Sequence, residues 1–271
     1  MIQSTHNQHV RRLRSLATRK GRRTHGQFLV EGVRALEEAR AGGLELATVA
    51  WCPQLASSAR ARELAGELAA AGARVLEMSE RAFRAFTQVQ APEGLAAAVT
   101  IPDTSLADIP VHADLLVAAV DVRDPGNLGA LLRTADAAGA QAFIAAGSCA
   151  DLYDPKVVRA TAGSIFHLMA VSDTTVEKML DWARASGVSS VAATVEGARP
   201  HTAIRYPARA LVMVGNEANG LPTEVAREAD LRACIAMPGR AESLNVAVAA
   251  GILLWEILRQ RGRDNDCDGE E

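Results

Sequence analysis

The sequence predicts two α/β domains, each built from a sheet of buried strands covered by helices. Short apolar runs alternate with stretches of helical periodicity along nearly the whole chain, which is typical of α/β folds. The apolar runs of the second half are continuous rather than alternating, as expected for parallel strands buried on both faces. A polar, proline-containing stretch near residues 101–113 separates the two series. We therefore expect domains at 1–105 and 114–262, a linker at 106–113, and a disordered acidic tail at 263–271.

The first series opens with a basic helix at residues 7–23, on which Val10, Leu13 and Leu16 form a thin apolar stripe. A second helix, at 33–43, is expected to end at its two glycines. Strands are predicted at 27–32, 46–52, 73–78 and 95–101, and the remaining helices at 59–72 and 79–89. Strands that alternate with helices in this way predict a parallel or mixed sheet.

The second series begins with the buried strand LLVAAVD at residues 115–121. Further strands are predicted at 141–146, 165–171, 188–194, 210–215 and 232–237, and helices at 128–139, 154–163, 175–187 and 222–230. The closing helix, from Val246 to Leu258, is apolar on every side except at Glu256. Such a helix is typically buried, so we expect its start to be buried as well.

Composition and charge exclude several classes of protein. The chain has 271 residues, of which 49% are hydrophobic, and a net charge of −3, so it is not a polycation as a whole. Its four cysteines are far apart and form no CxxC or Cys/His cluster, which favours reduced thiols in a cytosol over a metal site or disulfides. We find no signal-peptide pattern and no apolar run near the roughly 20 residues of a membrane span. A soluble, cytoplasmic protein is expected.

Polar residues collect at three junctions between strand and helix, where ligands bind in open parallel α/β sheets. At the first junction a buried strand runs into Asp124-Pro125-Gly126-Asn127, and Arg133 follows on a helix otherwise rich in Ala and Leu. Capping and turn formation alone would explain the Asp, Gly and Asn, and an isolated Arg can simply extend to solvent. The alternative is that Arg133 presents its fork of donors to a phosphate.

The second junction places Gly215, Asn216 and Glu217 directly after the strand that ends at Val214. A glycine-rich turn before a helix explains part of this pattern, but Glu217 is a poor turn residue. The third junction, Glu242-Ser243-Leu244-Asn245, precedes the apolar closing helix. Ser243 could cap that helix; if its start is buried, however, these polar side chains need partners, which suggests a ligand.

Motifs of more common chemistries are missing. The sequence contains no GxGxxG after the first strand of either domain, no Walker loop, no HExxH and no GxSxG. The six histidines fall mostly outside the three junctions, so a histidine-driven acid–base mechanism is not favoured. No metal site is expected.

Taken together, the three junctions resemble the three motifs of the SpoU/TrmH family of RNA ribose 2′-O-methyltransferases. The matching residues are Asn127, Gly129 and Arg133, then Gly215-Asn216-Glu217 with Gly220-Leu221-Pro222, then Ser243-Leu244-Asn245. The likeness covers most of residues 114–262, and the basic helix followed by GQFLVEGVRALEEA is similar to the substrate-binding domain often fused to these enzymes. The sequence departs from the family pattern at two positions. The proline of the third motif, Pro238, comes two positions later than usual, and Asp154 stands where relatives commonly have Asn; both differences concern the shape of local loops.

The resemblance implies a deep trefoil knot in the C-terminal domain, a homodimer, and S-adenosylmethionine as cofactor in a pocket of knot loops. The cofactor residues that it implies are Thr194, Glu196, Gly197, Val214, Gly215, Asn216, Ile235, Met237 and Leu244. The catalytic residues implied are Arg133, Asn127, Glu217, Ser243 and Asn245, with the Arg of one subunit often completing the site of the other. With an RNA enzyme expected, the acid-free basic segment becomes a candidate phosphate-binding surface, comprising Arg11, Arg12, Arg14, Arg19, Lys20, Arg22 and Arg23.

Several alternatives stay open at this point. The added N-terminal domain favours large-subunit (23S) ribosomal RNA as the substrate, and a tRNA is the alternative within the family. A catalytically silent RNA-binding protein is a second alternative, against which the intact motif residues argue. A nicotinamide-dependent dehydrogenase is a third, and the missing glycine fingerprint argues against it.

Overall fold

The computed structural model describes residues 1–56, 58–216 and 218–262, and within it the chain divides into two compact units. The first unit comprises Met1–Asp103 together with Tyr153–His167, and the second comprises Thr104–Leu152 and the chain from Leu168 onwards. The expected acidic tail at 263–271 and the motif residue Glu217 lie outside the described residues. The segment Tyr153–His167 thus groups with the N-terminal unit although it interrupts the second unit in the sequence.

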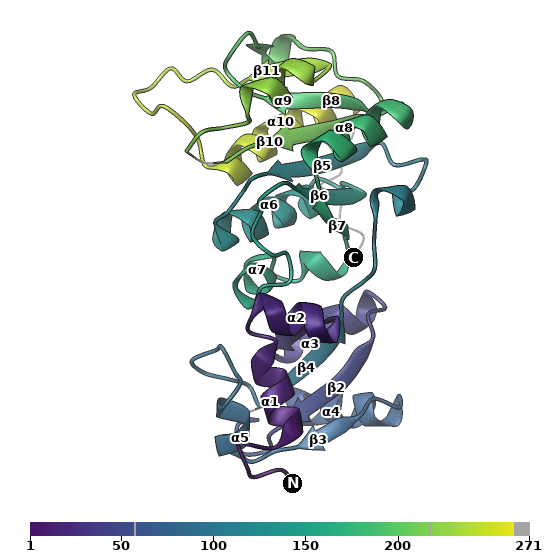
Figure 1. Cartoon of the computed structure of the whole chain (residues 1–271), viewed down its shortest axis with the longest axis vertical. Helices are drawn as coiled ribbons and strands as arrows, with labels where there is room; N and C mark the ends of the chain where they lie inside the picture. Colours follow the sequence, from purple (N-terminus) through teal and green to yellow (C-terminus); the bar gives the residue numbers. More distant parts are fainter. Residues whose placement is uncertain (57, 217, 263–271) are drawn as a thin grey trace. The chain divides into compact units, whose positions relative to one another are not determined.

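The first unit contains a four-stranded sheet of order β1-β4-β2-β3, of which β4, β2 and β3 are labelled in Figure 1. β4 pairs antiparallel with both β1 and β2, whereas β2 and β3 are parallel, so the sheet is mixed. Its elements are α1 (Gln8–Ser15), α2 (Arg19–His25), β1 (Gln27–Glu31), α3 (Val33–Ala41), β2 (Leu46–Trp51), α4 (Ala59–Ala70), β3 (Val75–Glu77), α5 (Glu80–Arg84) and β4 (Leu95–Thr100). Helix α7 (Pro155–Ala160) and the 3₁₀ turn η2 (Ser164–Phe166) complete it.

The basic helix predicted at 7–23 is in fact two helices. Thr18 has an extended backbone and begins α2, its hydroxyl accepting a hydrogen bond from Gly21 N at 3.1 Å. Gly21 fits the bend because a Cβ atom there would lie 2.0 Å from the carbonyl oxygen of Ser15. A threonine whose side chain caps a new helix has a non-helical backbone, so it interrupts a continuous one. The apolar stripe used for the prediction did not reveal this break.

The second unit contains a seven-stranded parallel sheet of order β7-β6-β5-β10-β8-β11-β9, which confirms the predicted α/β fold class. Its strands are β5 (Leu115–Val120), β6 (Ala142–Ala146), β7 (Met169–Thr174), β8 (Ser189–Ala193), β9 (Arg199–Pro200), β10 (Ala210–Val214) and β11 (Leu231–Cys234). Its helices are α6 (Pro125–Ala137), α8 (Val176–Ala185), α9 (Thr223–Glu228) and α10 (Val246–Gln260), with 3₁₀ turns η1 (Leu106–Asp108) and η3 (His201–Ala203).

The strand predicted at 165–171 was misplaced. Gly163, at φ 106°, begins the 3₁₀ turn η2, and the strand starts only at Met169. Ile165 and Phe166 are buried in the first unit rather than in the sheet, so their apolar character reflects a different packing surface. The two-residue strand β9 was not predicted, because two exposed residues carry no periodic signal.

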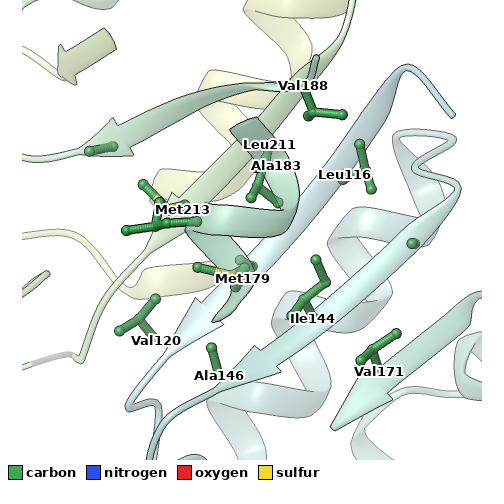
Figure 2. Packing of buried hydrophobic residues seen from close by; sticks show 14 of the residues in the cluster. Leu116, Val120, Ile144, Ala146, Val171, Met179, Ala183, Val188, Leu211 and Met213 are labelled. Carbon is green, nitrogen blue, oxygen red and sulfur yellow. The ribbon is translucent and has the colours of Figure 1, made fainter. Parts of the chain in front are cut away.

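Helices cover both faces of the parallel sheet, which explains its continuous apolar strands. On one face, Leu116, Ile144 and Met213 pack with Met179 and other residues of α8 and α9 (Figure 2). On the other face, α6 contacts β5, and α10 contacts both β10 and α6. All six residues of β5 are buried, so this strand lies at the centre of the core.

Candidate functional site

The first and second junctions meet at one edge of the sheet because β5 and β10 are parallel neighbours. β5 leads into the turn before α6, and β10 leads into the turn at Gly215–Gly220. β8, on the other side of β10, ends just before Thr194. Loops after neighbouring parallel strands form the usual ligand crevice of this architecture.

Helix α6 begins three residues earlier than predicted, and this brings Asn127 into its first turn. Asp124 is the N-cap, its Oδ1 accepting a hydrogen bond from Asn127 N at 2.8 Å, and Pro125 takes the first helical position. Asn127 in turn accepts a hydrogen bond from Asn245 Nδ2 through its own Oδ1, at 2.7 Å. This bond joins the first and third motifs, which are 118 residues apart in the sequence.

Asn245, not Ser243, caps the closing helix. Its Oδ1 accepts a hydrogen bond from Ala247 N at 2.9 Å, while its amide nitrogen binds Asn127. The expectation that the start of this helix is buried was wrong: Glu242, Ser243 and Asn245 are all exposed, and burial begins at Val246. The helix is apolar all round but is not covered all round, since Val248 and Trp255 are also largely exposed.

Arg133 lies on α6, six residues after Asn127. It directly follows the buried residues Leu131 and Leu132. Its side chain is exposed, and within the described parts of the chain it has neither a hydrogen bond nor an ion pair. A guanidinium without an acidic partner is free to bind an anion such as a phosphate.

The second motif forms a tight turn whose shape depends on Gly215 and Asn216. A Cβ atom on Gly215 would lie 2.2 Å from the backbone carbonyl of Gly220, so only glycine fits there. The Asn216 side chain donates to the carbonyl oxygen of Asp121 at 3.1 Å and accepts from Ala218 N at 2.9 Å. These bonds fix the turn against the end of β5.

The loops after β8, β10 and β11 enclose a cavity of about 420 Å³. Among the residues that line it are Thr194, Val214, Gly215, Asn216, Ile235, Met237 and Leu244, all implied by the family resemblance. Glu196 and Gly197 do not line it; Glu196 instead forms an ion pair with Arg227 at 3.5 Å. Leu221 of the second motif and Val195 of the loop after β8 also line it, although the resemblance did not assign them to the cofactor. The resemblance missed the apolar wall residues Ala193, Ala218, Ala233, Val246 and Ala249, which lie next to the motifs in the sequence.

The size and lining of this cavity suit a small, partly apolar ligand. Its volume falls in the range of roughly 300–1,000 Å³ typical of small-molecule sites, and its lining is mixed, with somewhat more apolar than polar surface. The missing side chain of Gly215 makes room for the backbone of Gly220 and Leu221, which gives this wall of the cavity its shape. Among the described residues that line the cavity, Glu242 is the one with an ionisable side chain.

A cluster of polar side chains ties the C-terminal end of α10 to the segment after η3. Gln260 donates to the carbonyl oxygen of Ile204 at 2.8 Å and accepts from Tyr206 N at 3.1 Å. Hydrogen bonds from Arg259 hold the pKa of the buried Glu256 down to about 2, and burial raises the pKa of Tyr206 to about 12. Both groups therefore keep one charge state near neutral pH and stabilise the fold rather than exchange protons.

Of the seven basic residues predicted to bind phosphate, six are on the surface. Those exposed are Arg11, Arg12, Arg14, Arg19, Lys20 and Arg23. Arg22 was wrongly included among them: it is 2% exposed and donates to the carbonyl oxygen of Leu16 at 2.9 Å and to Asp154 at 3.3 Å. Arg22 therefore ties α2 to the N-cap of α7 and is not available to a phosphate.

Two properties of the described residues bear on other classes of function. They contain no group of three or more His, Cys, Asp or Glu side chains placed to hold a metal ion. None of the helices found in those same residues is long and apolar enough to span a membrane.

Family models match both parts of the chain. The model described as the SpoU rRNA Methylase family matches residues 114–255, and the model described as the MRM3-like substrate binding domain matches residues 7–97.

Individual relatives match nearly the whole chain. The chain is 35% identical to the 23S rRNA (uridine(2479)-2′-O)-methyltransferase of Streptomyces viridochromogenes, over 91% of this chain and 87% of that protein. It is 33% identical to the 23S rRNA (guanosine(2553)-2′-O)-methyltransferase RlmP of Bacillus subtilis, over 94% of this chain and 98% of that protein. The structure is similar to the AdoMet-bound rRNA methyltransferase of Sinorhizobium meliloti, with a TM-score of 0.85, 35% identity, and coverage of 95% and 97%.

Proposed function

We propose, because the chain belongs to the SpoU rRNA methylase family, that it is an S-adenosylmethionine-dependent RNA ribose 2′-O-methyltransferase. One observation carries this proposal: three distant motifs meet in one site. The Asn127–Asn245 hydrogen bond joins the first to the third, while Asn216 and Ser243 line the same 420 Å³ cavity. The exposed guanidinium of Arg133, which has no partner among the described residues, belongs to the first of these motifs.

The cavity residues fit S-adenosylmethionine, which supplies a methyl group on a positively charged sulfur when it is bound. Apolar wall residues such as Val214 and Val246 would enclose the apolar part of the cofactor, and the turn that begins at Gly215 would offer backbone hydrogen-bond groups. We assign Thr194, Asn216, Ile235, Met237 and Leu244 to this pocket on the same ground.

For transfer, the residues of the chain must place a ribose 2′-hydroxyl so that its oxygen can attack the methyl group that the cofactor would supply. They must also help to remove the proton of that hydroxyl. Arg133 is hard to deprotonate, so we assign it to holding an RNA phosphate and the hydroxyl rather than to acting as a base. The bond from Asn245 holds Asn127 beside the start of α10. Ser243 lies at the cavity and Glu217 follows Asn216 directly, so both are assigned to the ribose side of the site.

Large-subunit ribosomal RNA is the proposed substrate. Relatives named for 23S rRNA align with more than nine-tenths of the chain, including the N-terminal unit. Six exposed basic residues on α1 and α2 are suited to phosphate contacts. The two relatives are named for a uridine and a guanosine, so the proposal extends to the ribose and to the RNA class, not to one base.

We further propose a homodimer, a trefoil knot in the C-terminal unit, and a cytoplasmic location. Support for the dimer comes from α10, where Val248 is 51% and Trp255 is 46% exposed on a helix rich in apolar residues. Support for the knot is the path from β11 through Ile235–Leu244 into a helix that packs on α6 and β10. The location is proposed from the substrate and from the relatives named above, which are bacterial proteins.

A methyl-transfer assay with labelled S-adenosylmethionine tests the substrate. Naked 23S rRNA, large ribosomal subunits and total tRNA would be offered in parallel, each from cells that lack this protein. We expect label in 23S rRNA or in the subunits, and none in tRNA. Transfer to tRNA alone would replace the proposed substrate, and binding of the cofactor without any transfer would favour a silent RNA-binding protein.

A further inference from the structure

We propose that Asp121 is a positioning residue for methyl transfer, because it holds the cavity turn at Asn216 and the segment leading to Asn127 in one arrangement. This inference rests on the proposed function. Asp121 follows β5 directly and lies six residues before Asn127. It belongs to none of the three motifs.

The backbone of Asp121 is unusual for a residue with a side chain. Its φ is 55°, in the left-handed region, which β-branched and bulky residues avoid and which Asp and Asn tolerate better than most. A backbone held in such a conformation persists only where surrounding contacts fix it, and such residues cluster at functional sites.

Asp121 makes contacts to two neighbouring strand ends. Its carbonyl oxygen accepts a hydrogen bond from Asn216 Nδ2 at 3.1 Å, which ties it to the turn after β10. Its side-chain Oδ1 accepts a hydrogen bond from Ser148 N at 2.6 Å, and its own N–H donates to Ala146 O at 3.2 Å, which ties it to the end of β6. The carboxylate sits so close to Gly147 that a Cβ atom there would lie 2.6 Å from Oδ1.

These contacts place Asp121 between the two halves of the site. Asn216 lines the cavity, and the chain that leaves Asp121 enters α6, which carries Asn127 and Arg133. A change in the backbone of Asp121 would therefore move the cavity turn relative to the first motif. A misplacement of about 1 Å between reacting groups can cost roughly 100-fold in rate.

Three substitutions separate the contributions of Asp121. Asp121→Ala removes the side-chain acceptor and disfavours the left-handed backbone; we expect kcat to fall by about 100-fold and the Kd for S-adenosylmethionine to rise. Asp121→Asn keeps an acceptor oxygen and tolerates positive φ, so kcat and Kd should stay within about twofold of wild type. Asp121→Gly keeps the backbone freedom but loses the acceptor, so it should fall between the two.

A matched pair of glycines tests the same contact from the other side. Gly147 and Gly139 have φ of 72° and 69°, but a Cβ atom on Gly139 would meet nothing within 4 Å. Both alanine variants carry the backbone penalty, and only Gly147→Ala also displaces the Asp121 carboxylate. We expect Gly147→Ala to reproduce the loss of kcat in Asp121→Ala, and Gly139→Ala to lower only the Tm.

The readouts are kcat and KM for methyl transfer, the Kd of S-adenosylmethionine by titration calorimetry, and the Tm. Wild-type kcat and Kd in Asp121→Ala would overturn the proposal. So would an Asp121→Asn variant as impaired as Asp121→Ala, or equal losses of kcat in the two glycine variants. If the wild-type protein itself transfers no methyl group, the proposed function fails, and the cofactor Kd of the same variants still decides whether Asp121 holds the Asn216 turn.

Discussion

Arg133 and Asn245 show how much of the site single residues could reveal. The sequence singled out Arg133 because a lone cation on an Ala/Leu-rich helix is unusual, and the structure leaves that side chain exposed and without a partner in the described chain. The local pattern predicted that Asn245 is buried, which was wrong, because the residue is exposed and caps α10. Nothing local relates Asn245 to Asn127, 118 positions away; only the family resemblance placed both in one site, and their hydrogen bond is seen only in the structure.

Arg133→Ala should abolish methyl transfer while leaving the Kd for S-adenosylmethionine nearly unchanged, since Arg133 does not line the cavity. Arg133→Lys keeps the charge but loses the planar fork, so partial activity is expected. Single-turnover transfer and calorimetric cofactor binding measure the two effects. Near-normal turnover in Arg133→Ala would remove this residue from the mechanism.

Asn245 combines a structural and a site contact, and two substitutions separate them. Asn245→Ala should lower the free energy of unfolding by about 0.5–2 kcal/mol, as expected for a lost N-cap, and should also impair transfer. Asn245→Asp keeps the capping oxygen but cannot donate to Asn127. It should therefore recover the Tm of the wild type without recovering kcat. Equal recovery of both would show that only the cap matters.

At the scale of helices and strands, continuous apolar runs located most of the parallel sheet, including the wholly buried β5. The errors occurred where a single residue interrupts a pattern. Thr18 divides the basic helix by capping α2, and Gly163 begins a 3₁₀ turn in an apolar run that reads as a strand. The prediction that Arg22 binds phosphate failed for a similar reason. The chain bends before α2, and Arg22 is buried although its basic neighbours are exposed.

The surface formed by α1 and α2 can be tested with two of its exposed cations, Arg11 and Lys20. Arg11→Gln combined with Lys20→Gln should weaken RNA binding and lower the slope of log K against log[salt] by about two, because each contact releases roughly one counterion. Arg62→Gln combined with Arg205→Gln is the matched control, since these arginines are equally exposed. If both pairs change the slope equally, the effect belongs to net charge and not to this surface.

At the scale of the whole molecule, the sequence predicted two α/β units and the parallel sheet, but it carried no signal for how distant segments thread or assemble. The knot and the dimer came only from the family resemblance, because composition and periodicity describe neighbours along the chain. The exposed apolar side chains of α10 are the feature of the structure that makes the dimer testable.

Trp255→Glu should convert the protein to monomers, because it places a charge in the proposed interface on α10. Val111→Glu is the control, since Val111 is 87% exposed and lies outside that helix. Light scattering after size-exclusion chromatography gives the mass of each variant. A wild-type protein that is monomeric at micromolar concentration, or a Trp255→Glu variant that remains dimeric, would contradict this assignment.

The central claim is that the three motifs form one site that transfers a methyl group to a ribose hydroxyl. The most direct test is to digest RNA labelled by the wild-type protein to nucleosides and to locate the methyl group by mass spectrometry. We predict a single 2′-O-methylated nucleoside, absent from RNA treated with Arg133→Ala. A methyl group on the base, or label that survives in the Arg133→Ala reaction, would contradict the account.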